Sequence, residues 1–210
     1  MLRFTSTTDH NVPIYHFSDV WSACAKYSQE LYLQLARTTS HYIRSTSDAA
    51  NTIVYSIVGS RLDYCNSLLA GISEQNLDSI QRVQSKGARI VCNAGRHSPS
   101  SDLLHSLHWL PVCHRIEFKT ATLCFKAVKL GTPSYLNNML KPYVPLRALR
   151  SSNMDLLAVP RTDTSFGLRR FSVAGPRVWN RLPHELRQCN TISSFKSNLK
   201  THYFRRHMDN

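Results

Sequence analysis

Acidic side chains are scarce in this sequence of 210 residues: 13 Asp and Glu stand against 26 Lys and Arg, giving a net charge of +13. Glycine is also scarce, with seven residues, and the absence of long Ser/Gly-rich or Pro-rich tracts argues against a mostly disordered chain. No apolar run reaches the roughly 18 residues that a membrane-spanning helix needs. The first residues lack the apolar segment of a secretory signal, so we expect an intracellular protein, in the cytoplasm or nucleus.

The six cysteines include no CxxC pair. We therefore expect reduced thiols that are mostly buried, with Cys113 in the core. Cysteines and histidines do gather between Cys92 and His114, but their spacing does not fit a zinc knuckle. Ser100 and Leu103 stand where such a motif requires two cysteines. We expect no zinc site and no cofactor.

Sequence motifs for catalysis are lacking. The nine aspartates are dispersed, with no Asp-Asp or Asp-x-Asp pattern, whereas nucleotidyl transfer by two metal ions needs clustered carboxylates. Neither of the Gly-rich phosphate loops, GxGxxG and GxxxxGKS/T, is present, and no GxSxG elbow of a serine hydrolase is found. We expect that this chain alone is not an enzyme.

The positive charge that is present lies almost entirely in the second half of the chain. Residues 1–110 hold nine Lys and Arg against eight acids, whereas residues 111–210 hold seventeen against five, a net charge of +12. This asymmetry favours a polyanionic partner, most often nucleic acid and less often an anionic membrane or a heparin-like surface. The alternative is a highly soluble surface with no partner.

Apolar periodicity predicts a mainly α fold. We expect helices over about 18–38, 48–58, 74–92, 101–107, 111–129, 172–182 and 191–204, and a short β-hairpin within 155–171. Gly59 and Gly131 are expected to end the second and fifth of these helices. Ser73 is the expected N-cap of the third.

The helix over 111–129 is expected to have two distinct faces. Ile116, Leu123 and Ala127 form the predicted buried stripe. Basic residues recur on another face, at Arg115, Lys119, Lys126 and Lys129, and the helix over 74–92 has its own outward set, Arg82, Lys86 and Arg89. Long basic side chains at such spacings can follow a phosphate backbone without reading its sequence. Trp109 and Trp179 lie in apolar blocks, and we expect them in the core rather than stacked on bases.

Several blocks resemble the region that follows the polymerase core in reverse transcriptases of non-LTR (LINE-type) retrotransposons. They occur in the same order as in that family and cover about residues 20–205. The blocks are SRLDYCNSLLAGI at 60–72, LDSIQRVQSKGARIV at 77–91, LLHSLHWLPVCHRIEFKTATLCFKAV at 103–128, PSYLNNMLKPY at 133–143, LRSSN at 149–153, VPRT at 159–162, RRFSVAGPRVWNRLPHELR at 169–187 and ISSFKSNLKTHYF at 192–204.

The resemblance implies a division of the chain. We expect an unstructured start over 1–17, thumb-like helices over 18–72, a helical basic region over 73–143, and a loop or hairpin with C-terminal helices over 144–210. The metal-binding aspartates of the palm would lie upstream of Met1, so the chain is similar to a truncated, non-catalytic piece of an RNA-directed DNA polymerase. The family's C-terminal Cys-His knuckle is not carried over, because its spacing is absent.

In that family the thumb and the following region would hold the template–primer backbone, so the expected partner is RNA or DNA. An upstream polymerase core that this chain lacks is a further candidate partner. The candidate phosphate contacts are Arg61, Arg82, Lys86, Arg89, Arg115, Lys119, Lys126, Lys129, Arg161, Arg169, Arg170 and Arg177. The alternative is a host helical interaction protein whose basic surface serves a protein or an anionic membrane.

Overall fold

The computed structural model describes residues 47–63, 66–145, 154–164 and 167–208, and there the chain is mainly helical, as predicted. The expected unstructured start and the helix over 18–38 lie outside the described residues. Short 3-10 helices are labelled η. The elements are α2 (Ser47–Asp63), η1 (Asn66–Leu69), α3 (Glu74–Val91), α4 (Ser100–Ser106), α5 (Val112–Leu130), α6 (Ser134–Met139), η2 (Gly167–Arg169), α7 (Phe171–Arg181), α8 (His184–Arg187) and α9 (Ile192–Met208).

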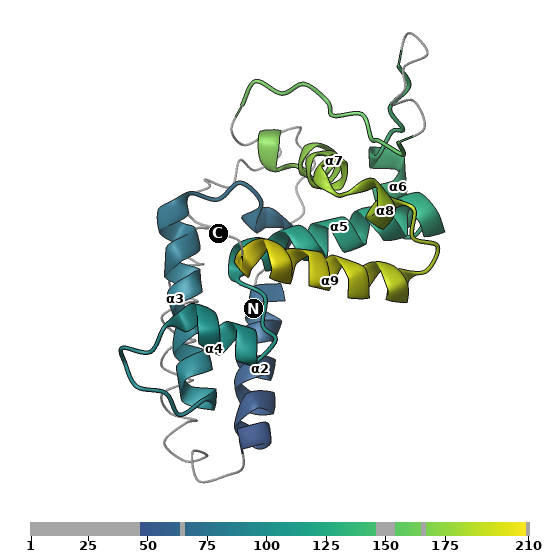
Figure 1. Ribbon diagram of the computed structural model, residues 1–210. Helices are drawn as coiled ribbons and strands as arrows, with labels where there is room; N and C mark the ends of the chain where they lie inside the picture. The colour runs from purple at the N-terminus through teal and green to yellow at the C-terminus, as the bar shows by residue number, and fades with distance from the viewer. Residues whose placement is uncertain (1–46, 64–65, 146–153, 165–166, 209–210) are drawn as a thin grey trace, which may run out of the picture.

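Two hydrophobic clusters share α5 as their common wall. The first, which we call the α2–α5 cluster, packs α2, η1, α3 and α4 against the beginning of α5, where Val112 and Ile116 are buried. The second, the α5–α9 cluster, packs the rest of α5 against α6, α7, α8 and α9. Figure 1 shows α9 running alongside α5 while α2, α3 and α4 extend away to one side.

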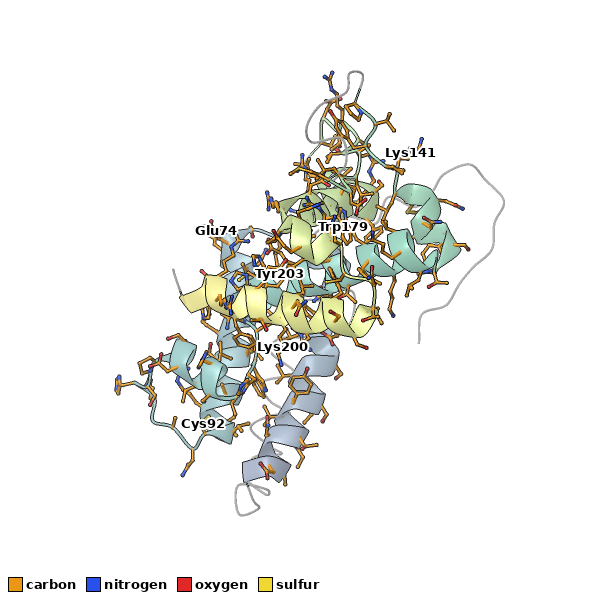
Figure 2. The ribbon with its side chains drawn as sticks, turned by 45° about the vertical axis from the view of Figure 1, so that its right-hand side comes forward. Glu74, Cys92, Lys141, Trp179, Lys200 and Tyr203 are labelled. Atoms are coloured by element: carbon orange, nitrogen blue, oxygen red, sulfur yellow. The ribbon has the colours of Figure 1, made fainter. Side chains whose placement is uncertain are left out.

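Aromatic rings fill the α5–α9 cluster. Phe125 of α5 and Phe195 of α9 stack with ring centroids 4.5 Å apart, and Trp179 of α7 lies 6.0 Å from Phe195. Figure 2 shows Trp179 and Tyr203 on the neighbouring helices α7 and α9. Trp179 is fully buried, and Trp109 is 5% exposed in the other cluster, so the prediction that both tryptophans are core residues is confirmed.

The start of α5 is satisfied by side chains from α3. Its N-cap, Pro111, has no side-chain group to offer, but Gln81 accepts a hydrogen bond from the Val112 N–H at 2.9 Å. Gln84, 2% exposed, receives a bond from Gln81 and donates to the Leu110 carbonyl at 2.8 Å. The first N–H groups of a helix have no partner within the helix, so these two glutamines stabilise the α3–α5 junction.

The predicted helix boundaries hold well for α3 and α5. Gly131 ends α5 with φ +65°, a left-handed conformation that glycine adopts readily, as expected. Ser73 does occupy the N-cap of α3, although its side chain makes no capping hydrogen bond. The prediction for Gly59 was wrong, because α2 continues through it to Asp63. That extra turn places Leu62 in the α2–α5 cluster. The burial of Leu62 favours continuation of the helix beyond Gly59.

The expected β-hairpin within 155–171 is not found, since the described residues include no strand. An antiparallel bridge joins Pro142 to Leu157 instead, with hydrogen bonds from Tyr143 N to Leu156 O and from Ala158 N to Lys141 O. Residues 156–158 therefore pair with residues 141–143, which follow α6, and not with a later segment of the expected hairpin.

Side chains from α7 and α8 hold the same segment from its other side. The Asn180 amide accepts from the Leu157 N–H at 2.9 Å and donates to the Leu157 carbonyl at 2.8 Å, as a neighbouring strand would. The Trp179 indole N–H donates to Asp155 O, and buried Arg187 donates to Met154 O. These contacts replace the hairpin that the apolar run suggested.

Two expectations about buried residues need correction. Ile116 and Ala127 are buried as predicted, but Leu123 is only half-buried, because it lies at the edge of α5 where no helix covers it completely. Among the described cysteines only Cys124 is buried, and burial raises the pKa of its thiol to about 12. Cys113, the second residue of α5, is exposed and not in the core.

We expect Leu199→Ala to lower the free energy of unfolding by about 2–5 kcal/mol, because Leu199 is fully buried in the α5–α9 cluster and its truncation leaves a cavity. Leu123→Ala removes the same atoms from a half-buried site and should cost about 1 kcal/mol. Urea unfolding followed by circular dichroism compares the two variants. Equal losses would contradict the burial described here.

Candidate nucleic-acid interface

The basic residues of α3 form an outward face. Arg82 and Lys86 are exposed, in agreement with the expected orientation, and Arg82 donates to the Ser79 hydroxyl one turn earlier. Arg89 is half-buried and donates to the Ser98 carbonyl at 3.2 Å. Of these three, Arg82 and Lys86 are the most accessible to a large ligand.

Arg115 is not an accessible cation. It is 8% exposed, and its Nε donates to Asp63 Oδ1 at 2.8 Å. Its guanidinium also lies against Tyr55, with two nitrogens 3.4 and 3.5 Å from the phenol oxygen. The expectation that Arg115 contacts phosphates is therefore corrected. The Arg115 side chain points into the protein, where it links the start of α5 to the end of α2.

Asp63 is held by two cations, since Lys119 Nζ lies 2.8 Å from its other oxygen. Burial alone would raise the pKa of Asp63, but the hydrogen bonds and charges of Arg115 and Lys119 outweigh it and hold that pKa below its ordinary value. The carboxylate is thus ionised at neutral pH. It neutralises part of the positive charge at the start of α5.

The last two candidates of α5 differ from each other. Lys129 is exposed and pairs with Asp155, Nζ to Oδ2 3.3 Å. Lys126 is half-buried and has no hydrogen bond or ion pair with any described residue. Its charge is therefore available to a ligand.

A groove of about 380 Å³ gathers three arginines, and we call it the arginine groove. Arg169 comes from η2, and Arg177 and Arg181 come from successive turns of α7. Its other lining residues are mostly apolar: Leu69, Ala70, Gly71, Ile72, Leu77, Cys113, Ile116, Glu117, Leu168, Ala174 and Val178. Two candidates, Arg169 and Arg177, are thereby brought together, and Arg181 was missed by sequence reasoning because nothing in α7 itself reveals the groove.

Glu117 is the carboxylate of the arginine groove. Its oxygens lie 4.0 Å from Arg181, 3.7 Å from Arg206 and 3.9 Å from His114. Burial would raise the pKa of Glu117, but the nearby side chains of His114, Arg206 and Arg181 lower it on balance. One ionised carboxylate therefore stands among several guanidinium groups, which leaves the groove positive.

The remaining candidates are spread over the C-terminal region. Arg161 and Arg170 are exposed, and Arg170 reaches back to the Gly167 carbonyl at 3.5 Å. The side chain of Arg61 lies outside the described structure. The structure thus does not unite all candidates in one strip, but it does concentrate several of them in the arginine groove and along α5.

Within the residues that the structure describes, no three His, Cys, Asp or Glu side chains come together as a set that could hold a metal ion. The same residues include no helix that is long and apolar enough to cross a membrane.

Comparisons of the chain with protein-family models, with curated proteins and with solved structures find no match.

We expect Asp63→Asn to lower the free energy of unfolding at pH 7 by about 1–3 kcal/mol, because buried Arg115 loses its ionic partner. A carboxylate whose pKa is lowered in the folded state stabilises it above the ordinary value, near 3.9, and this contribution disappears as the pH falls through the folded pKa. The difference between wild type and variant should therefore shrink as the pH falls below this ordinary value and through the lower folded pKa.

Urea titrations at several pH values measure this difference, with Asp78→Asn, an exposed aspartate of α3, as the matched control. If Asp63→Asn behaves like the control at pH 7, the pair with Arg115 does not stabilise the fold.

Proposed function

We propose that this chain is a non-catalytic, backbone-binding piece of a reverse transcriptase of the non-LTR retrotransposon type. The observation that carries the binding part is the arginine groove, where three guanidinium groups line one hollow in the half of the chain with a net charge of +12. Guanidinium groups bind phosphate oxygens through two parallel hydrogen bonds, so such a groove suits a polyphosphate strand.

The composition of the groove favours a single strand over a small anion. Its wall includes apolar side chains such as Leu69, Ile72 and Leu77 beside the arginines. A nucleic-acid strand has both surfaces, charged phosphates and flat bases, and proteins that bind single strands combine positive charge with apolar contact. Arg170 directly follows Arg169 of the groove and is exposed, and Arg161 is exposed as well.

The ordered sequence blocks support the remaining part of the proposal. They resemble the region that follows the polymerase core, where charge for holding template and primer is needed and catalytic carboxylates are not. The partners are then RNA or DNA and a polymerase core supplied by another chain or segment, in the cytoplasm or the nucleus.

Binding to single-stranded RNA or DNA should weaken steeply with salt, because each neutralised phosphate releases condensed counterions. About six contacts imply a slope of log K against log salt on the order of −4 to −5. Arg177→Gln with Arg181→Gln should make that slope shallower by roughly 1.5, since both side chains line the groove and are exposed.

The control pair, Arg96→Gln with Lys141→Gln, removes the same charge from exposed positions outside the groove. Fluorescence anisotropy over a salt series measures all three proteins. Equal slopes for the two double variants, or no binding at low salt, would refute the proposal and favour a host interaction protein with a protein or membrane partner.

We expect no template-dependent primer extension from the purified chain with Mg²⁺ or Mn²⁺, because the sequence has no Asp-Asp or Asp-x-Asp motif to hold two metal ions. Incorporation above a blank that a point substitution in this chain abolishes would overturn the non-catalytic assignment.

A further inference from the structure

A second cavity lies between the end of α2, η1, the middle of α5 and the start of α9. Its volume is about 420 Å³, and we call it the lysine pocket. It shares no lining residue with the arginine groove. The lining residues are Asp63, Asn66, Phe118, Lys119, Thr120, Thr122, Leu123, Lys126 and Lys196.

Three ammonium groups and one carboxylate line the lysine pocket. Lys119 and Lys126 come from α5, and Lys196 comes from α9. Lys119 is paired with Asp63, at 2.8 Å. Lys126 is half-buried and Lys196 is exposed, and neither makes a hydrogen bond or an ion pair with a residue that the structure describes. The net charge around the cavity is therefore +2, and two of its three cations are available to a ligand.

The lysine pocket and the arginine groove lie on opposite sides of α5. Glu117 lines the arginine groove, whereas Lys119 and Lys126 line the lysine pocket. Successive residues of an α-helix are rotated by about 100°, so these two lysines, two and nine positions after Glu117, point about 200° and about 180° away from it. The helix with its side chains, about 10–12 Å across, stands between the two cavities. A phosphate group in one cavity is therefore out of contact with the cations of the other.

Positive charge continues from the lysine pocket along α9. Lys200 lies one turn after Lys196, and residues four apart share a face of a helix. Lys200 is exposed, and Figure 2 shows its place on α9. The 17 residues of α9 include no Asp or Glu. Such a row of cations suits a chain of phosphates better than one small anion, because each further lysine can neutralise a further phosphate.

We propose that the lysine pocket binds the phosphate backbone of a second nucleic-acid strand while the arginine groove holds the first. This inference rests on the proposed function, because it takes the arginine groove as the site of the first strand. The lysines and arginines neutralise phosphates on both strands, which removes part of the repulsion between two polyanions. The free parts of two complementary strands are thereby kept close, and the chain accelerates their pairing.

The first experiment counts the strands on each chain. Native mass spectrometry of the full chain uses oligo(dT) of about six nucleotides, near the lower end of single-strand site sizes, so that one strand occupies one cavity. These strands cannot pair with each other. Wild type should bind two strands. Lys126→Gln with Lys196→Gln should bind one, through the arginine groove, and Arg177→Gln with Arg181→Gln should bind one, through the lysine pocket.

The control pair is again Arg96→Gln with Lys141→Gln, because both positions are exposed and line neither cavity. It should keep two strands. One strand on wild type, or two on the double lysine variant, would overturn the inference. If wild type binds one strand and the double arginine variant loses it, the proposed function stands without the inference. If wild type binds no strand, both fail.

The second experiment follows the pairing of two complementary DNA strands, each of about 20 nucleotides and thus longer than one binding site, by energy transfer between end labels. Wild type at low salt should accelerate pairing by about tenfold or more, because a basic surface raises the local concentration of polyanions. The acceleration should be greatest near one chain for two strands and should fall when excess protein gives each strand its own chain.

The double lysine variant and the double arginine variant should each lose most of this acceleration, although each still binds one strand. The control pair should keep it. Pairing at the rate seen in buffer alone, or equal acceleration by wild type and the double lysine variant, would overturn the inference, whereas the salt-dependent binding of one strand would still support the proposed function.

Discussion

The burial of α5 on two sides is the constraint on which the rest of the structure depends. Its first turns pack into the α2–α5 cluster and its later turns into the α5–α9 cluster, so neither cluster is complete without it. The ion pair between Arg115 and Asp63 lies where the end of α2 meets this helix, and Gln81 satisfies its first N–H. The arginine groove also borders α5, because Ile116 and Glu117 are among its lining residues.

Local signals in the sequence predicted a helix well where its boundaries depend on residues within or next to that helix. Apolar spacing after Ser73 predicted where α3 begins and ends, and Gly131 predicted the end of α5. The same rules failed at Gly59, where the burial of Leu62 outweighs the low helix propensity of glycine. They also failed for residues 155–171, because the pairing of Leu157 with Pro142 and Asn180 depends on helices that are distant in sequence.

The candidate site was predicted only in part, for a related reason. Periodicity correctly predicted that Arg82 and Lys86 point outward, but it also assigned Arg115 to the outward face. A long basic side chain gives no sign of a half-buried carboxylate 52 residues away, that of Asp63. Arg181 acquires its importance from the arginine groove that it lines. Cavities form between elements, so a pattern within one helix cannot reveal them, whereas the net charge of the second half does indicate the sign of the partner.

The double hydrogen bond between Asn180 and Leu157 has a consequence for self-association. An extended segment with free N–H and C=O groups is a template on which a second chain can add as a strand, and this is a common route to aggregation. Residues 156–158 use one edge to pair with 141–143, and the Asn180 amide occupies the backbone groups of Leu157 on the other edge. A single side chain thus covers the outer edge of the bridged segment at Leu157, where the backbone groups would otherwise be open to a strand from a second copy.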